Sequence, residues 1–194
     1  MVQNSITFDY VHDCQETFRL MLHAISNPGE IVNIKNHSDK LKDDFSHMLL
    51  LAVTLLDKET SYCVLDNEEL DKLIAQLTYA YYKDENADYI FVSEKYSYEK
   101  MIDILIKSSP GTLVNPHANT TLIICDDMLG NPISLCLEGP GIKDSKTIEV
   151  SDYIKQWIST RDLMEYEYPL GVDLFFITKE GELLSIPRKV KMKG

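Results

Sequence analysis

The fold of this chain is decided by one stretch near its end, Tyr168-Pro169-Leu170-Gly171-Val172-Asp173-Leu174-Phe175-Phe176-Ile177-Thr178. From Val172 to Ile177 the stretch is rich in aromatic and β-branched side chains, which is typical of a strand buried on both faces of a sheet. Asp173 is the one polar residue in this run. An unpaired buried charge is very costly, so the Asp173 carboxylate needs hydrogen bonds or a cation.

A second, shorter strand follows directly. Residues 179–182 are typical of a turn, and residues 183–186 are apolar enough for a strand. Pro187-Arg188 ends that strand, because proline cannot donate to a central ladder. The resulting hairpin brings Asp173 and Arg188 to the same edge of the sheet. Either the two side chains satisfy each other, or together they frame a site for something polar.

Length and charge narrow the class of protein. A chain of 194 residues suggests a single α/β domain over residues 1–194, with a short basic tail from about Arg188 that we expect to be solvated. Nineteen basic against thirty-one acidic residues give a net charge of −12. This charge argues against sequence-independent nucleic-acid binding, which needs a basic face that neutralises phosphates.

The sequence also indicates in which cellular compartment the protein is expected. No apolar run approaches the roughly 20 residues of a membrane span, and the first residues lack the pattern of a signal peptide. The four cysteines lie far apart, without a C-x-x-C pair, on apolar stripes or strands. We therefore interpret them as small buried hydrophobic residues and expect a cytoplasmic protein.

The order of elements predicts the architecture. Asp13 with Glu16 three residues later forms a capping box for a first helix, and Ser151 caps the last one. Strands and helices alternate through the first half, whereas hairpins dominate the second. The strand at 120–125 is expected to reverse through the polar turn 126–131 into a strand at 133–137. This pattern predicts an α/β fold, a three-layer α/β/α sandwich with a mixed sheet.

Four short stretches hold polar or glycine residues at strand ends, where open α/β sheets bind ligands. They are residues 26–29, 108–112, 138–141, and 169–173 with Arg188. The second stretch lacks the lysine of a P-loop, and the third lacks the last glycine of a dinucleotide motif, so plain turns are the simpler interpretation of both. The candidate ligand- or partner-binding residues are Arg19, Ser26, Gly29, Thr112, Glu138, Gly139, Gly141, Asp173 and Arg188.

Catalytic patterns are not found in the sequence. The five histidines do not converge in any metal-binding spacing, and no G-x-S-x-G nucleophile motif occurs. No lysine stands in the apolar strand-end setting that tunes a Schiff base. We predict no catalytic residue, no metal site and no cofactor, and we interpret the chain as a binding or assembly subunit.

A set of segments also occurs in a familiar order. They are Phe18-Arg19-Leu20-Met21-Leu22, residues 24–29, Gly111-Thr112, Thr121-Leu122-Ile123, residues 137–142, residues 168–174 and Ile186-Pro187-Arg188. On these segments the chain resembles the PhnH family, the H subunit of the bacterial carbon–phosphorus lyase system for phosphonate use. The resemblance runs from about residue 8 to 188. Tyr168 departs from it, standing where the family usually has phenylalanine, and residues 36–100 match only in pattern.

The resemblance implies a homodimer whose fold is similar to the large domain of fold-type I pyridoxal-phosphate (PLP) transferases, without that cofactor or its lysine. Members of the family work with the G, I and L subunits and join the complex that contains the J subunit. Together these subunits replace the adenine of ATP with a phosphonate, giving a ribose 1-phosphonate 5-triphosphate that the J subunit cleaves. The nucleosidase-like chemistry is ascribed to the I subunit, so the H subunit is expected to be accessory.

Two hypotheses follow. In the first, the chain is a non-catalytic component of the transferase complex whose strand-end loops face a partner subunit. In the second, it binds a phosphonate or a nucleotide such as ATP, with Arg19 or Arg188 as an anion fork. The net charge of −12 favours the first hypothesis, because it repels a triphosphate at long range, although salt screens this effect.

Overall fold

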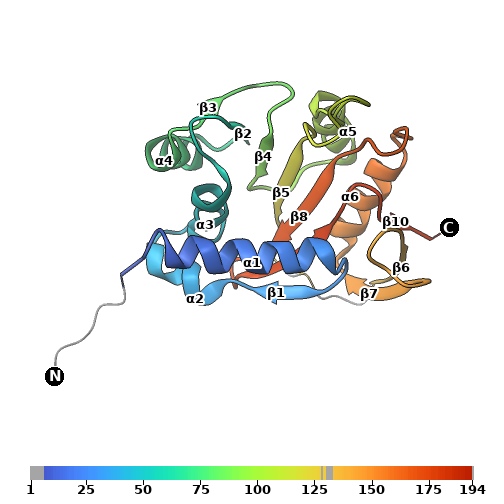
Figure 1. The fold of residues 1–194 in the computed structure, drawn as a ribbon, viewed down its shortest axis with the longest axis horizontal. Helices are drawn as coiled ribbons and strands as arrows, with labels where there is room; N and C mark the ends of the chain where they lie inside the picture. Colours follow the sequence, from blue (N-terminus) through green and yellow to red (C-terminus); the bar gives the residue numbers. More distant parts are fainter. Residues whose placement is uncertain (1–6, 128, 130–132, 194) are drawn as a thin grey trace.

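A seven-stranded mixed sheet forms the centre of the computed structural model, which describes residues 7–127, 129 and 133–193. Its strands lie in the spatial order β1-β9-β8-β5-β4-β2-β3 (Figure 1). Strands β8, β5, β4, β2 and β3 run parallel, whereas β9 is antiparallel to both β8 and β1. The prediction of an α/β fold with a mixed sheet is therefore confirmed. The strand bounds are β1 Ile31–Asn33, β2 Ser61–Leu65, β3 Tyr81–Tyr82, β4 Tyr89–Val92, β5 Thr121–Cys125, β8 Asp173–Ile177 and β9 Glu182–Ile186.

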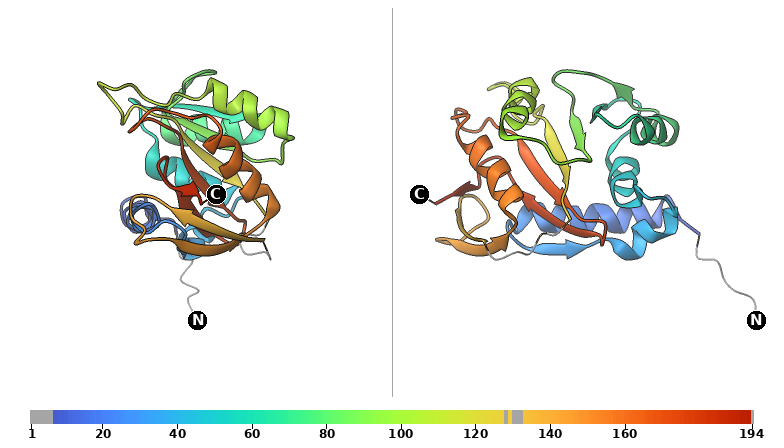
Figure 2. Two further views of the ribbon diagram at one scale, coloured as in Figure 1. Left: turned by 90° about the vertical axis from the view of Figure 1, so that its right-hand side faces the viewer. Right: turned by 180° about the vertical axis from the view of Figure 1, so that it is seen from behind.

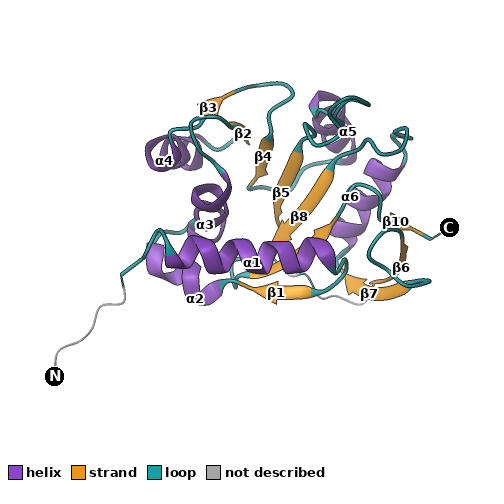
Figure 3. Cartoon of the chain, in the orientation of Figure 1, coloured by secondary structure: helices purple, strands orange, loops and turns teal. Residues whose placement is uncertain are grey.

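Helices cover both faces of this sheet, and Figure 3 distinguishes them from the strands by colour. Leu174 and Phe176 of β8 belong to the core on the side of α5 and α6, while Phe175 and Ile177 belong to the core on the side of α1, α3 and α4. Figure 2 shows α1 and the α5–α6 pair on opposite sides of the strands. The predicted strand at 172–177 is thus buried on both faces. The helix bounds are α1 His12–Ser26, α2 Lys35–Ser38, η1 Asp39–Leu41, α3 Ser46–Leu55, α4 Glu68–Thr78, α5 Tyr98–Lys107 and α6 Asp152–Asp162.

A second, three-stranded sheet corrects two expectations. It consists of β6 (Ile133–Glu138), β7 (Lys146–Val150) and β10 (Lys191–Met192), with β6 in the middle. The predicted hairpin between β5 and β6 is wrong, because β4 and β8 occupy both edges of β5. The turn expected at 126–131 includes residues outside those described. The basic tail is not merely solvated, since β10 pairs with β6 and Val190 is fully buried.

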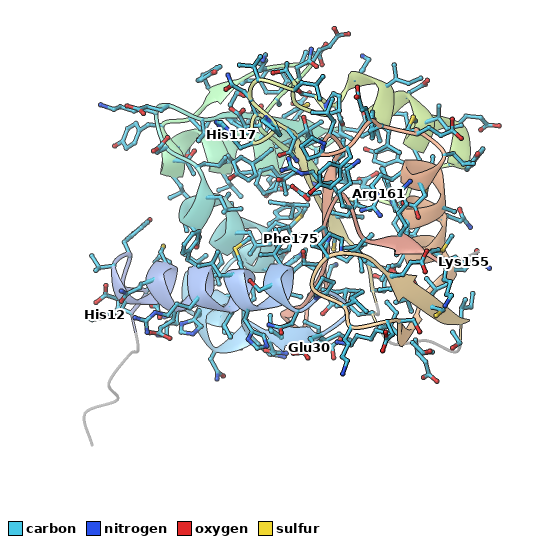
Figure 4. All side chains as sticks on the ribbon, turned by 45° about the vertical axis from the view of Figure 1, so that its right-hand side comes forward. His12, Glu30, His117, Lys155, Arg161 and Phe175 are labelled. Atoms are coloured by element: carbon cyan, nitrogen blue, oxygen red, sulfur yellow. The ribbon has the colours of Figure 1, made fainter. Side chains whose placement is uncertain are left out.

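A buried guanidinium holds the segment that leads into this tail. The Arg161 side chain, on α6, is 2% exposed and lies between the helix and the end of β9 (labelled in Figure 4). It donates hydrogen bonds to the carbonyl oxygens of Ile186 (3.0 Å), Pro187 (3.2 Å) and Val190, and it pairs with Asp162 at 2.9 Å. Charge-assisted bonds of this kind are stronger than neutral ones. The chain from residue 186 to 190 is therefore fixed against α6.

The start of α1 differs from the predicted capping box. The helix begins at His12, and the carboxylate that caps it belongs to Asp9, which accepts the backbone N–H groups of Val11 (2.9 Å) and His12 (3.0 Å). Asp13 lies inside the helix, and Glu16 instead pairs with Arg19. The predicted cap at Asp13 therefore placed the start of the helix two residues too late.

Asp13 has a tertiary role instead. Its side chain is 3% exposed and accepts hydrogen bonds from Lys40 Nζ (2.6 Å), His37 Nδ1 (2.7 Å) and the backbone N–H of Asp9 (2.8 Å). Burial alone would raise the pKa of this carboxyl, but the three hydrogen bonds outweigh it and lower the pKa to about 2. The carboxylate thus joins α1 to the segment α2–η1.

None of the helices among the described residues is both long and apolar enough to cross a membrane.

The low pKa of Asp13 predicts how stability depends on pH. A carboxyl whose folded-state pKa is depressed stabilises the protein above its ordinary value of 3.8, and that stabilisation is lost as the pH falls towards about 2. The loss amounts to roughly 2 kcal/mol. In urea unfolding at pH 5, 4 and 3, the free energy of unfolding of Asp13→Asn should therefore fall less steeply than that of the wild type.

Glu69→Gln, which alters an exposed carboxylate on α4, is the matched control and should keep the wild-type slope. Parallel curves for the wild type and Asp13→Asn would contradict the prediction.

Candidate functional site

The first candidate cluster lies where β8 begins. The backbone N–H of Arg188 donates to Asp173 Oδ1 at 2.7 Å, so the hairpin brings these two residues to one edge as predicted. Their side chains meet through a third residue. Asn119 Nδ2 donates to Asp173 Oδ2 at 2.8 Å, and Arg188 Nη1 donates to Asn119 Oδ1 at 2.6 Å. The sequence left two arrangements open. In the structure, Asp173 and Arg188 satisfy each other's hydrogen-bonding groups, and Asn119 bridges their side chains.

The loop that carries Asn119 also contains Thr112. Arg188 Nη1 donates a further hydrogen bond to the carbonyl oxygen of Pro116, and Gly171 N–H donates to Pro110 O at 3.0 Å. The Thr112 hydroxyl accepts the backbone N–H of Asn115 at 3.0 Å, so it is used within its own turn. Thr112, Asp173 and Arg188 therefore belong to one cluster in which the polar groups brace a loop.

The second cluster joins two segments that are distant in sequence. Gly141, at φ +86°, lies so close to the turn after α1 that an added Cβ would stand 2.9 Å from Pro28 Cδ and 3.1 Å from Ser26 O. Gly29, at φ +80°, would place a Cβ 2.8 Å from a methyl group of Ile148. Both positions favour glycine, because φ is positive and an added Cβ would crowd the neighbouring atoms. The cluster contains the candidates Ser26, Gly29, Gly139 and Gly141, with Glu138 at the end of β6.

A cavity of about 200 Å³ opens between these two segments. Lys143 and Lys146 line it beside Pro28, Gly141 and Glu30. Glu30, labelled in Figure 4, pairs with His23 at 3.0 Å and with Lys146 at 3.5 Å. The hydrogen bond from His23 and the charge of Lys146 lower the pKa of the Glu30 carboxyl. The sequence did not single out the two lysines, although they stand two and five residues after Gly141.

Arg19 stands apart from both clusters. It lies on the exposed side of α1, where it pairs with Glu16 at 3.2 Å, and its side chain is 65% exposed. Across residues 7–127, 129 and 133–193, no hydrogen bond or ion pair joins Arg19 to Asp173 or Arg188. The predicted residues are thus divided between two clusters and one isolated arginine.

The Asp173 cluster lies at the amino ends of the parallel strands, which is not the end of the sheet where ligands are expected to bind. Open α/β sheets bind ligands beyond the carboxyl ends of parallel strands, whereas Asp173 and its register partner Thr121 are the first residues of β8 and β5. At the carboxyl edge, Asp126 follows β5, is 2% exposed and accepts hydrogen bonds from Ser151 Oγ and Lys95 Nζ (3.1 Å). The sequence missed this group, although an aspartate directly after a buried strand could have signalled it.

The pKa values of Lys95, Cys125 and His47, near the carboxyl ends of the strands, do not favour a nucleophile. Asp126 and Asp127 raise the pKa of Lys95, so the amine stays protonated and is no nucleophile. The Cys125 thiol lies 3.5 Å from His47 Nε2, and both side chains are buried. Burial raises the pKa of Cys125 to about 11, while burial and the charge of Lys179 lower the pKa of His47 to about 4. Because the thiol stays protonated and the imidazole beside it stays neutral, Cys125 is not an activated nucleophile.

No metal centre is found in the part of the chain that the structure describes, because no three of its histidine, cysteine, aspartate and glutamate residues are grouped to hold an ion.

Comparison with known proteins identifies the family. Residues 7–193 match the family model described as "Bacterial phosphonate metabolism protein (PhnH)". The chain belongs to the PhnH family. A relative from Stutzerimonas stutzeri, named "Putative C-P lyase subunit protein HtxG", is 26% identical over 188 residues, which cover 93% of this chain and 87% of the relative. The resemblance to PhnH proteins stated from the sequence is confirmed, and the match includes both clusters.

The bridge formed by Asn119 gives a prediction for this PhnH-family chain. Asn119→Ala removes a donor to Asp173 and an acceptor for Arg188, and it leaves two charged groups with fewer partners. We expect the free energy of unfolding to fall by about 1–3 kcal/mol, and residues 110–119 to become more sensitive to limited proteolysis.

Asn115→Ala is the control, because the Asn115 side chain is exposed in the same loop. Equal stability and equal cleavage of the two variants would show that the bridge does not brace the loop.

Proposed function

We propose that this chain is a non-catalytic, accessory subunit of the carbon–phosphorus lyase pathway for phosphonate use. In this role it is a cytoplasmic homodimer needed by the complex that replaces the adenine of ATP with a phosphonate, forming ribose 1-phosphonate 5-triphosphate. Its partners would be the G, I, J and L subunits. The proposal is supported by the membership of the PhnH family and by the relative named as a subunit.

The observation that carries the proposal is the state of the polar groups in the Asp173 cluster. Asp173, Asn119 and Arg188 are joined to one another and to the loop backbone. A general acid or base must reach a reacting group on the substrate, and its pKa must suit the transfer of a proton. Side chains that already satisfy each other instead hold a surface in one shape, which is what a docking subunit needs.

The decisive experiment is co-purification. The tagged chain, produced together with the G, I and J subunits, should retain all three through affinity and size-exclusion steps. The purified chain alone should not convert ATP and methylphosphonate. A chain that always elutes free of the other subunits, or one that turns over substrate without them, would overturn the proposal.

A second candidate function is binding of the phosphonate or the nucleotide itself. The cavity of about 200 Å³ beside Gly141 favours it, because Lys143 and Lys146 line a concave site next to exposed backbone. Lysine ammonium groups bind phosphate-like oxygens as point charges. The Arg188 guanidinium suggested by the sequence is already bonded to Asn119 and Pro116, and Lys146 pairs with Glu30 at 3.5 Å, so Lys143 is the cation best placed to meet a free anion.

Isothermal titration tests this candidate. Methylphosphonate or ATP should release or absorb heat with the wild-type chain, and the double variant Lys143→Ala, Lys146→Ala should bind at least about tenfold more weakly. Lys155→Ala, an exposed lysine on α6, is the control and should bind as the wild type does. No heat from the wild type with either compound would reject this function for the isolated chain.

A further inference from the structure

A cavity of about 470 Å³ lies at the β3 end of the main sheet, away from both clusters described above. Residues 63–66, at the end of β2, form one side of it, and Tyr82 and Asp84 form a second side. The third side is a stripe of α5 between Lys100 and Lys107. We call this cavity the edge groove.

The edge groove begins where the sheet lacks a strand. On one side of β2, β4 pairs with it from Tyr62 to Leu65, whereas on the other side β3 pairs only with Ser61 and Tyr62. In the described part of the chain, no other strand pairs with residues 63–65. An open strand edge presents N–H and C=O groups that can pair with another chain. The groove thus lies along a free segment of the β2 edge.

The length of the groove suits a short extended peptide. The stripe from Lys100 to Lys107 is about 10 Å long, at 1.5 Å per helical residue, and three residues of a strand also span about 10 Å. The loop after β3 is tied to the end of α5, because the backbone N–H of Asn86 donates to Lys107 O at 2.8 Å. Figure 1 shows this loop arching from β3 to β4 on the side where α5 lies. Three residues of a peptide therefore match the free edge of β2 at residues 63–65.

The charges of the groove favour a basic occupant. Three carboxylates and two lysines line it. Lys100 pairs with Asp66 at 3.8 Å, and Lys107 lies 4.0 Å from Glu85, which is outside the lining. Among the described residues, the other two lining carboxylates, Asp84 and Asp103, form no ion pair. Two exposed carboxylates without a cation therefore complement a positively charged group.

An aromatic ring stands beside these carboxylates. The Tyr82 side chain is 52% exposed, and its hydroxyl lies 3.7 Å from the Cys63 thiol at the buried end of the groove. The face of a tyrosine ring attracts an ammonium or guanidinium group. The ring thus adds to the preference of Asp84 and Asp103 for a cation.

We propose that the edge groove binds an extended, basic segment of a partner protein, which adds to the sheet beside β2. The inference rests on the proposed role as a subunit, and it names a surface and the chemistry of the segment that docks there. In strand addition, the backbone of the peptide bonds to the open edge, and pockets for alternate side chains provide specificity. Here a lysine or arginine of the segment meets Asp84, Asp103 and the ring of Tyr82.

Two observations favour a protein segment over a free small cation. The open edge of β2 offers main-chain hydrogen bonds, which a peptide backbone can use and an amine alone cannot. Ile106, on the α5 wall, is 68% exposed, and Tyr82 opposite is also half exposed. Tyrosine and apolar residues around a groove are typical of surfaces that contact another protein.

The affinity of the full chain for a purified complex of the G, I and J subunits tests the proposal. The double variant Asp84→Lys, Asp103→Lys should bind at least about tenfold more weakly than the wild type, because the added ammonium groups repel a basic segment. The double variant Glu149→Lys, Glu165→Lys adds the same charge at exposed positions outside the groove, and it should bind as the wild type does. Circular dichroism and thermal melting of each variant show that it folds.

Photocrosslinking provides a second measurement. With Ile106→p-benzoylphenylalanine, the chain should crosslink to one of the G, I and J subunits through a segment that contains lysine or arginine. The same replacement at Leu163, which is also 68% exposed but does not line the groove, is the control and should not give this crosslink.

A failure of the inference is distinct from a failure of the proposed function. Equal affinity of the wild type and the Asp84, Asp103 variant for the complex, or no crosslink from position 106, would overturn the inference and leave the proposed subunit role standing. A wild-type chain that does not bind the complex at all would overturn both. Arginine amide that binds the isolated wild type, while the Asp84, Asp103 variant keeps its affinity for the complex, would show that the groove takes a free organic cation, which also overturns the inference.

Discussion

The rest of the structure depends on the buried guanidinium of Arg161. This group lies at the end of α6 and binds the carbonyl oxygens of Ile186, Pro187 and Val190. These carbonyls lie at the last residue of β9 and just beyond it, where the strand ladder ends, and the Pro187 oxygen also accepts the backbone N–H of Val190 at 2.8 Å. Unsatisfied backbone groups are costly away from water. One cation therefore turns an irregular segment into a fixed connection between the two sheets.

Both candidate clusters are attached to that segment. Arg188 extends from it to Asn119 and, through its backbone, to Asp173. Lys189 and Val190 pass so close to Gly139 that an added Cβ there would stand 2.5 Å from Lys189 O. The segment thus couples the loop before β5 to the loop between β6 and β7, although these loops lie on different sheets. Such coupling is what one expects of a rigid subunit whose surfaces must hold their shape.

The prediction from the sequence succeeded where the determinants were local. Ser97, Asn67 and Ser151 cap their helices with side chains that accept the amides of Lys100, Leu70 and Ile154. The sequence had indicated the cap at Ser151. The Asp13 cap failed because His37, Lys40 and the amide of Asp9 bind that carboxylate.

The prediction of a hairpin between β5 and β6 was wrong, because the two strands belong to different sheets. The bridge through Asn119 could not be anticipated, since an asparagine in a loop carries no signal of its partner.

What the sequence by itself determined is the central hairpin, because a run of apolar residues broken by Asp173 and closed by Pro187-Arg188 specifies two buried strands with a polar edge. It also indicated the family, because several short segments occur along the chain in the order typical of PhnH proteins. Only the tertiary structure decided which groups those polar residues meet: Asn119 between Asp173 and Arg188, and Arg161 on the carbonyls beyond β9. The physical reason is that periodicity records which face of an element is buried, whereas a hydrogen bond between distant segments depends on distances that exist only once the chain has folded.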